Sequence, residues 1–100
     1  MNEYILFMHD DAVDSALAND SQRWGQYIAT LRASGQFDGG SAIGSGTLLR
    51  KGRAGQAAPT DITGYIRIRA ESFDAAQRFL IGNPVYEAGG TVEIRELLRE

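Results

Sequence analysis

Three stretches of this chain carry clear strand patterns, and the distances between them limit the folds that contain all three. Residues 4–8, Tyr-Ile-Leu-Phe-Met, form a continuous apolar run, which is typical of a strand buried on both faces near the middle of a sheet. Residues 62–69 and 91–98 instead alternate between apolar and polar side chains, which is the two-residue period of a half-buried strand. The long stretches between these strands must hold the remaining elements.

A helix is predicted between the first two strand patterns. It is expected to begin at Asp20 or Ser21, because either side chain accepts a hydrogen bond from a free backbone N–H of the first turn, and to end at Gly35. Gly25 lies inside this helix at a cost of about 1 kcal/mol relative to alanine, which indicates close packing there. The apolar face has helical spacing and consists of Trp24, Tyr27, Ile28 and Leu31.

A second helix and a weak strand complete the element order. The helix is predicted to begin after Ser72, a good N-cap, and to end at residues 82–84, Gly-Asn-Pro. Residues 37–43 have poor strand propensity because Gly39 and Gly40 are adjacent in them. They predict a short strand with a bulge or a close backbone approach.

The whole chain, residues 1–100, is predicted to form one domain. Residues 47–50 indicate a return strand, and residues 52–60 lack periodicity and indicate a loop. The resulting order β–α–β–β–α–β is the split βαβ arrangement of a ferredoxin-like α+β fold with an antiparallel sheet. A core of this size is thin, which favours sharing an apolar face with a second copy.

Charge and composition exclude several classes of function. The net charge is −3 and the basic residues are dispersed, so no nucleic-acid partner is expected. The one local cluster, Arg50, Lys51 and Arg53, indicates a solvated hairpin tip. The absence of cysteine excludes disulfides and thiol chemistry. No apolar stretch is long enough to span a membrane, and no signal peptide is apparent, so a cytoplasmic protein is expected.

Several segments resemble the YCII-related family, and its DGPF branch in particular. Gly64-Tyr65-Ile66 is similar to a Gly-Tyr-Tyr strand of the family, and residues 89–95, Gly-Gly-Thr-Val-Glu-Ile-Arg, are similar to its Gly-Gly-x-Val-Glu-Val-Arg ending. The apolar run of residues 4–8 and the helix end at residues 31–35 resemble further family segments. The resemblance implies a ferredoxin-like monomer that pairs into a dimeric α+β barrel, with a cleft between the sheet and the partner.

The chain departs from the family pattern at two places. The DGPF sequence is absent, and residues 57–61 read Ala-Ala-Pro-Thr-Asp instead. The resemblance implies a catalytic His and Asp on or just after the first helix, but Trp24 and Ala33 stand at those positions. Neither replacement transfers a proton, so that pair's chemistry is not expected here.

His9 is the first candidate for a catalytic role, because it is the only histidine and stands at the end of the first strand, where it is expected at the rim of a cleft. Asp10 or Asp11 is expected to orient it if the chain turns back. The alternative is a strand-end histidine bonded to backbone or water. One histidine with two adjacent carboxylates is an incomplete ligand set, so no metal site is expected.

The second candidate site is a polar sheet face. Tyr65, Arg67 and Arg69 share one side of their strand, and Glu93 and Arg95 share one side of the last strand. An arginine enclosed there by a second copy needs an anionic partner. That partner is either Glu93 across the strands or a ligand carboxylate, in which case Tyr65, Arg67 and Arg95 bind the ligand.

A third candidate group is Asp38 with Ser41 in the glycine-rich stretch, where backbone amides approach a ligand closely. The alternative is that the glycines merely form a bulge in an edge strand. No Gly-x-Ser-x-Gly motif or other nucleophile arrangement is present.

Three functions follow from these patterns. The first is a homodimeric protein that binds a small anionic ligand or acts as an accessory to another protein, without a cofactor. The second is a cofactor-free enzyme of the dimeric α+β barrel type in which His9 is the general acid or base. The third is a protein-interaction module.

Overall fold

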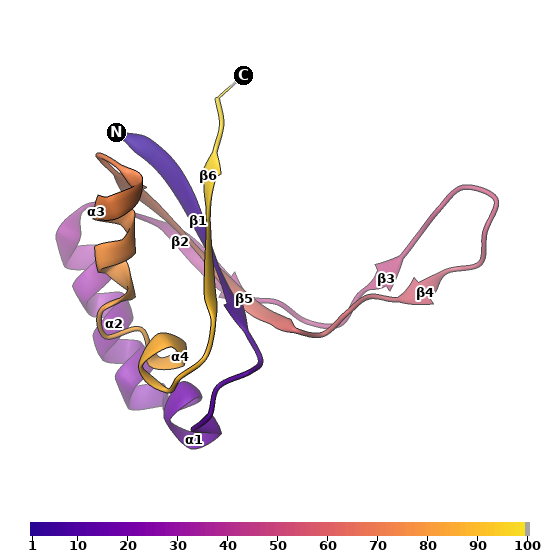
Figure 1. The fold of residues 1–100 in the computed structure, drawn as a ribbon, viewed down its shortest axis with the longest axis horizontal. Helices are drawn as coiled ribbons and strands as arrows, with labels where there is room; N and C mark the ends of the chain where they lie inside the picture. The colour runs from indigo at the N-terminus through magenta and orange to yellow at the C-terminus, as the bar shows by residue number, and fades with distance from the viewer. Residues whose placement is uncertain (100) are drawn as a thin grey trace.

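The computed structural model describes residues 1–99 and shows an α+β fold with a four-stranded antiparallel sheet (Figure 1). The strand order is β2-β5-β1-β6, which is the ferredoxin-like topology and confirms the predicted fold class. The elements are β1 (Asn2–His9), α1 (Ser15–Ala18), α2 (Ser21–Ser34), β2 (Phe37–Ala42), β3 (Thr47–Leu48), β4 (Gln56–Ala57), β5 (Ile62–Ala70), α3 (Phe73–Gln77), a 3-10 turn (Arg78–Leu80), α4 (Pro84–Glu87) and β6 (Val92–Leu97).

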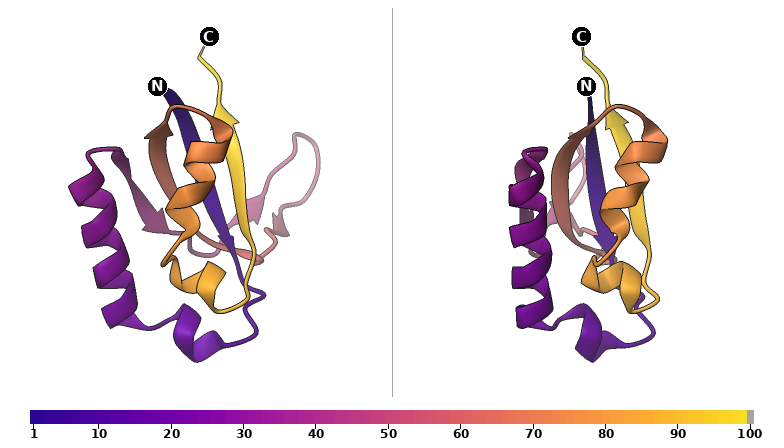
Figure 2. Two further views of the ribbon diagram at one scale, coloured as in Figure 1. Left: turned by 60° about the vertical axis from the view of Figure 1, so that its left-hand side comes forward. Right: turned by 90° about the vertical axis from the view of Figure 1, so that its left-hand side faces the viewer.

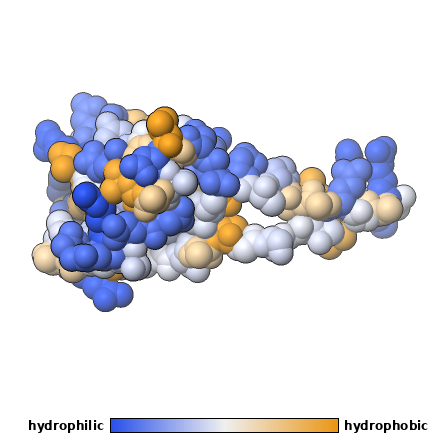
Figure 3. Space-filling view, turned by 90° about the horizontal axis from the view of Figure 1, so that it is seen from below, coloured by the Kyte–Doolittle hydropathy of each residue, from blue (hydrophilic) through white to orange (hydrophobic). Residues whose placement is uncertain are grey.

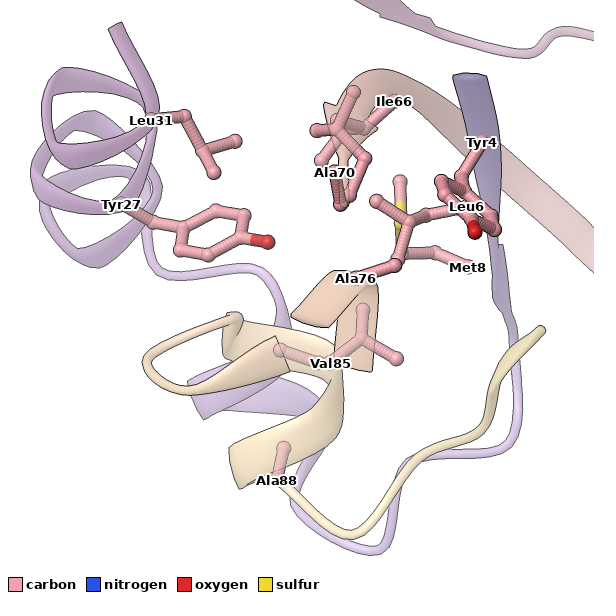
Figure 4. Close-up of a cluster of buried hydrophobic side chains, with 12 residues drawn as sticks. Tyr4, Leu6, Met8, Tyr27, Leu31, Ile66, Ala70, Ala76, Val85 and Ala88 are labelled. Carbon is pink, nitrogen blue, oxygen red and sulfur yellow. The ribbon is translucent and has the colours of Figure 1, made fainter. Parts of the chain in front are cut away.

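The helices lie on one face of the sheet and leave the other face uncovered (Figure 2). Alternate residues of β1 and β5 are buried beneath the helices, because side chains on a strand point to opposite faces. Helix residues such as Tyr27, Leu31 and Ala76 complete this core (Figure 4). The strand residues that form it are Tyr4, Leu6, Met8, Ile66, Ile68 and Ala70.

The first strand is less enclosed than its apolar run predicts. Ile5 and Phe7 point away from the helices and remain half-buried, although β5 and β6 flank β1 on both sides. The prediction of burial on both faces was therefore wrong for the single chain. Two-sided apolarity marks a central strand, but helices cover only one side of it.

Local signals at the helix ends were correct. Asp20, not Ser21, is the N-cap of α2, and its carboxylate accepts hydrogen bonds from the backbone N–H groups of Gln22 and Arg23 at 2.9 and 3.1 Å. Gly35 ends α2 in the left-handed conformation with φ of 73°. Ser72 caps α3 by accepting a hydrogen bond from the Ala75 N–H.

The glycine pair distorts β2 in both of the predicted ways. The pairing of β2 with β5 shifts register between Phe37 and Gly40, and Gly39 has φ of 100°. At Gly40 a Cβ atom would lie 2.4 Å from the carbonyl oxygen of Tyr65. β2 therefore lies against β5 at a distance that only glycine permits.

Residues 43–61 form a long hairpin that leaves the sheet, and we call it the arm (Figure 1). β3 pairs with β4 in a separate two-stranded sheet, with Thr47 opposite Ala57 and Leu48 opposite Gln56. Residues 47–50 thus do not return to the main sheet, and part of the predicted loop is a strand. Alanine and glycine give no alternation, which is why the sequence pattern missed β4.

The prediction of close packing at Gly25 was wrong, since no heavy atom lies within 4 Å of a Cβ built there. We therefore expect Gly25→Ala to raise the free energy of unfolding by about 0.5–1 kcal/mol, because alanine loses less backbone entropy in a helix. Urea denaturation monitored by circular dichroism measures this. A destabilised variant would show that α2 packs more closely than the structure indicates.

Candidate functional site

A cavity of about 500 Å³ lies between α2, the segment that contains α1, and the helix-facing side of the sheet. The sheet contributes through β1, β2 and β5, and Val85 of α4 also lines the cavity. Its apolar walls are formed mainly by Met8, Trp24, Ile28, Phe37, Ile66 and Val85. Polar residues occur at fewer positions, and they include His9, Asp10, Asn19, Arg32, Ser41 and Tyr65.

Helix α2 supplies one wall of the cavity through residues at four-residue spacing. Trp24, Ile28 and Arg32 follow one another along a single face of the helix and all line the cavity. The indole N–H of Trp24 donates a hydrogen bond of 2.7 Å to the Ala18 carbonyl, and its ring meets Tyr27 edge-on at 5.9 Å. These contacts hold the Trp24 ring in a fixed position at the cavity wall.

Arg32 is the one arginine or lysine among the described residues that line the cavity. It lies in the last turn of α2, where a positive charge is favoured by the helix dipole. Within residues 1–99, no side-chain hydrogen bond or ion pair engages its guanidinium. It therefore presents an unused cation, with donors suited to a carboxylate or another oxyanion, beside apolar walls.

His9 lies at the end of β1, and its Nε2 contacts Oε1 of Glu93 at 2.9 Å. Glu93 stands on β6, which pairs with β1, so the sheet register brings the two side chains together. Neither Asp10 nor Asp11 fills the orienting role expected for it. The Asp10 side chain forms no hydrogen bond among the described residues, and Asp11 is bonded to Thr91.

The hydrogen bonds to Glu93 and Asp11 favour their charged forms. The Arg95 guanidinium, followed by His9, lowers the pKa of Glu93. The Thr91 hydroxyl, followed by its backbone N–H, lowers the pKa of Asp11. Both carboxylates therefore stabilise the fold at a pH above their unfolded pKa, and this contribution is lost as the pH falls through the folded values.

We expect Thr91→Val to lower stability at neutral pH and to reduce its dependence on pH in acid. The variant removes the hydroxyl that donates to Asp11, so the pKa of that carboxyl returns toward its ordinary value. Denaturant titrations at a series of pH values below neutral measure the effect, with Thr60→Val on the arm as the matched control. If the free energies of unfolding of the wild type and the variant differed by the same amount down to acid pH, this linkage would be contradicted.

The face of the sheet opposite the helices, which we call the open face, carries most of the other predicted site residues. Tyr65 pairs in register with Phe7 and Ser41, while Arg67 and Arg95 flank Ile5 on its two sides. The arginines are engaged by carboxylates. The ion pairs are Arg67–Glu3 (3.6 Å), Arg99–Glu3 (3.2 Å), Arg69–Asp38 (3.0 Å) and Arg95–Glu93 (2.5 Å).

Asp38 and Ser41 are separated by the bulge in β2 and do not act together. The Asp38 carboxylate accepts hydrogen bonds of 3.1 and 3.0 Å from Nε of Arg69, and Nη2 of the same arginine donates to the Gly35 carbonyl. Ser41 donates to the backbone carbonyl of Ala42. Asp38 thus ties the start of β2 to β5, whereas Ser41 lines the cavity.

The predicted site residues therefore divide between two places. His9, Asp10, Ser41 and Tyr65 border the cavity, although strand alternation places Ser41 and Tyr65 on the open face. Arg67, Arg95 and Asp38 lie outside the cavity lining. Sequence patterns drew attention to neither Arg32 nor the pairing of His9 with Glu93. The four-residue spacing of Arg32 from Ile28 and Trp24 was the available signal for the former. No group of three or more histidine or acidic side chains among residues 1–99 is arranged to hold a metal ion.

No helix in the described part of the chain combines the length and apolarity needed to cross a membrane. No protein-family model matches the sequence, and no curated protein does. One solved structure that resembles the fold is 5-chloro-2-hydroxyhydroquinone dehydrochlorinase (TftG) from Burkholderia phenoliruptrix AC1100, in complex with 2,5-dihydroxybenzoquinone. The match has a TM-score of 0.59 and 15% sequence identity, and covers 98% of this chain and 95% of that chain. This likeness establishes the fold.

Proposed function

We propose that this protein binds a small, planar, anionic molecule in the cavity between α2 and the sheet, and that it acts as a homodimer. The observation that carries the proposal is the guanidinium of Arg32, which has no side-chain partner among residues 1–99 and lies beside the apolar walls of a cavity of about 500 Å³. Such a volume lies within the usual range of about 300–1,000 Å³ for small-molecule sites. A few polar groups among apolar walls are also typical of such sites.

The wall residues indicate the shape and charge of the ligand. The fixed ring of Trp24 offers an aromatic surface for a planar molecule. Arg32 lies about two turns further along the same helix and offers two parallel donors for an oxyanion. The structure of TftG contains 2,5-dihydroxybenzoquinone, which is a planar ring with acidic hydroxyl groups. A compound of this chemical class satisfies both features of the cavity.

The homodimer is supported by the composition of the open face. Ile5 and Phe7 lie at its centre, on the middle strand β1, and are only half-buried in the single chain. A second copy packed on this face would remove both side chains from water. Around them four arginines share three carboxylates, so the enclosed face would retain an excess of positive charge. Contact of Arg67, Arg95 and Tyr65 with an anion there remains a prediction.

Trp24 is the only tryptophan of the chain and lines the cavity, so its fluorescence reports directly on binding. We expect saturable quenching by 2,5-dihydroxybenzoquinone or by aromatic carboxylates, after correction for their absorbance. Arg32→Gln should raise the Kd by about tenfold or more, because a hydrogen bond to a charged group contributes about 1.5–3 kcal/mol. The matched control is Arg23→Gln, which removes the same charge from α2 outside the cavity. Equal Kd values for the two variants would contradict the role of Arg32.

A cofactor-free enzyme is the second candidate function, and the contact between His9 and Glu93 favours it. A carboxylate bonded to Nε2 fixes the orientation of the imidazole, as a general base requires. His9 also lines the cavity. If this function is correct, the wild type converts a bound compound, and His9→Gln abolishes conversion while the Trp24 quenching persists. Binding without conversion in the wild type, followed by ¹H NMR, would leave only the first function.

A further inference from the structure

Beyond its two ends, which are hydrogen-bonded to Thr63 and Asp10, the arm (residues 43–61) has no stabilising partner among residues 1–99. Figure 3 shows it projecting well clear of the body of the molecule. Its hydrogen bonds over residues 44–60 are internal, namely the pairing of β3 with β4, a bond from Ala58 N–H to the Gly46 carbonyl, and a turn closed from Arg53 to Arg50. No ion pair joins those residues to the rest of the described chain.

An isolated two-stranded hairpin of this kind is only marginally stable in water. Leu48 and Leu49, near the middle of the arm, are 50% and 82% exposed. The outer edges of the two-residue strands β3 and β4 also leave backbone N–H and C=O groups without strand partners, which makes them templates for pairing. These features fit an element that is covered by another chain.

The charge of the arm is complementary to its own base. Arg50, Lys51 and Arg53 lie at the tip, and no acidic residue falls within residues 43–60. The net charge of −3 therefore comprises +3 on residues 43–60 and −6 on the remaining residues. At the base, Asp61 lies beside Asp10, whose N–H donates to the Asp61 carbonyl at 2.7 Å. Neither carboxylate forms an ion pair among residues 1–99.

We propose that two copies of this chain pair arm to arm in antiparallel orientation, with each basic tip against Asp10 and Asp61 at the base of the other arm. A two-fold axis through the middle of the arms satisfies both contacts at once, because an isologous interface repeats each contact. The same arrangement covers Leu48 and Leu49 of both copies. This inference rests on the proposed homodimer and specifies the residues that hold it together.

The pairing also bears on the ligand site. Asp10 lines the cavity, so a partner tip bound at Asp10 lies beside the cavity and supplies cations to its border. The cavity would then be completed by the second copy, and a ligand carboxylate would experience a more positive field than in the single chain. Ligand binding and dimerisation are therefore expected to strengthen one another.

Sedimentation of the full-length protein over a range of concentrations tests the proposal. The tip variant carries Arg50→Glu, Lys51→Glu and Arg53→Glu, and the base variant carries Asp10→Lys and Asp61→Lys. We expect each to raise the dimer Kd by about tenfold or more at low salt, because like charges then face each other across the interface. Combining both sets in one chain should restore the Kd toward that of the wild type. Circular dichroism verifies that each variant is folded.

The control variant reverses the charge at Arg23 and Arg78 by substitution with glutamate. Both are exposed arginines of the helical layer without ion pairs among the described residues. It should dimerise as the wild type does. A wild-type dimer whose Kd is unchanged in the tip variant would overturn the arm pairing while leaving the homodimer intact. If the tip and base variants raised the dimer Kd but the combined variant did not lower it again, the contact with Asp10 and Asp61 would be overturned. A wild type that is monomeric throughout would overturn both proposals.

Discussion

Replacing Leu6 with alanine is expected to lower the free energy of unfolding by about 2–5 kcal/mol. Leu6 has no exposed surface and lies in β1, the strand that pairs with both β5 and β6. In register it stands between Ile66 and Ile94, so the deleted methyl groups leave a void that neighbouring strands cannot close by a local shift. Urea denaturation followed by far-ultraviolet circular dichroism measures the loss.

Val13→Ala is the control for this prediction, because Val13 is 89% exposed and its truncation should change stability by less than about 0.5 kcal/mol. A Leu6→Ala effect no larger than that of the control would mean that β1 is not the central buried strand. The order β2-β5-β1-β6 would then be in question, since it is this order that buries Leu6.

The second large effect is expected at Gly40, where alanine should destabilise the protein by about 1–3 kcal/mol. Its Cβ atom would lie 2.4 Å from the Tyr65 carbonyl oxygen and 3.2 Å from the Ile66 Cα. Both are backbone atoms of β5, so relief requires the two strands to separate. Because β2 forms part of the cavity, binding of the aromatic acid should weaken together with stability.

Gly25→Ala, made in the same background, separates this clash from the general effect of replacing glycine. It introduces the same methyl group into open space on α2 and is expected to stabilise the protein. Opposite signs for the two substitutions would support the close approach of β2 to β5. A neutral Gly40→Ala would show that the edge strand adjusts freely.

Local chemistry made much of the fold predictable from the sequence. The cap at Asp20, the stop at Gly35 and the alternation of residues 62–69 act over a few residues and do not depend on the rest of the chain. Their order was sufficient to indicate the ferredoxin-like topology. The bulge at Gly39 and Gly40 was predictable for the same reason, since adjacent glycines weaken a strand wherever it pairs.

The candidate site was less predictable because it depends on contacts between distant parts of the chain. The partner of His9 is Glu93, and only the register of β1 with β6 brings the two residues together. Nearby Asp10 and Asp11 were reasonable expectations from proximity in sequence, but a strand end directs neighbouring side chains to opposite sides. Arg32 looked like any exposed helix residue until the position of α2 beside the sheet placed it at the cavity.

The two faces of the sheet also have different roles in this account. On the open face the arginines are already paired with carboxylates, and exposed ion pairs of this type contribute only about 0–1 kcal/mol each. On the helix face the cavity combines an apolar wall with Arg32, which forms no ion pair within the described part of the chain. The central claim is therefore that the ligand binds on the helix face of the sheet.

Chemical-shift mapping of the full-length protein by two-dimensional NMR, with 2,5-dihydroxybenzoquinone and with benzoate as probes, tests that claim most directly. We predict that the largest shifts occur at the Trp24 indole N–H, the Arg32 side chain and the backbone amide of Gly40, all at the cavity. The amides of Ile5 and Arg67 on the open face should change far less. Shifts confined to Ile5, Arg67 and Arg95, or no shifts with either compound, would contradict the claim.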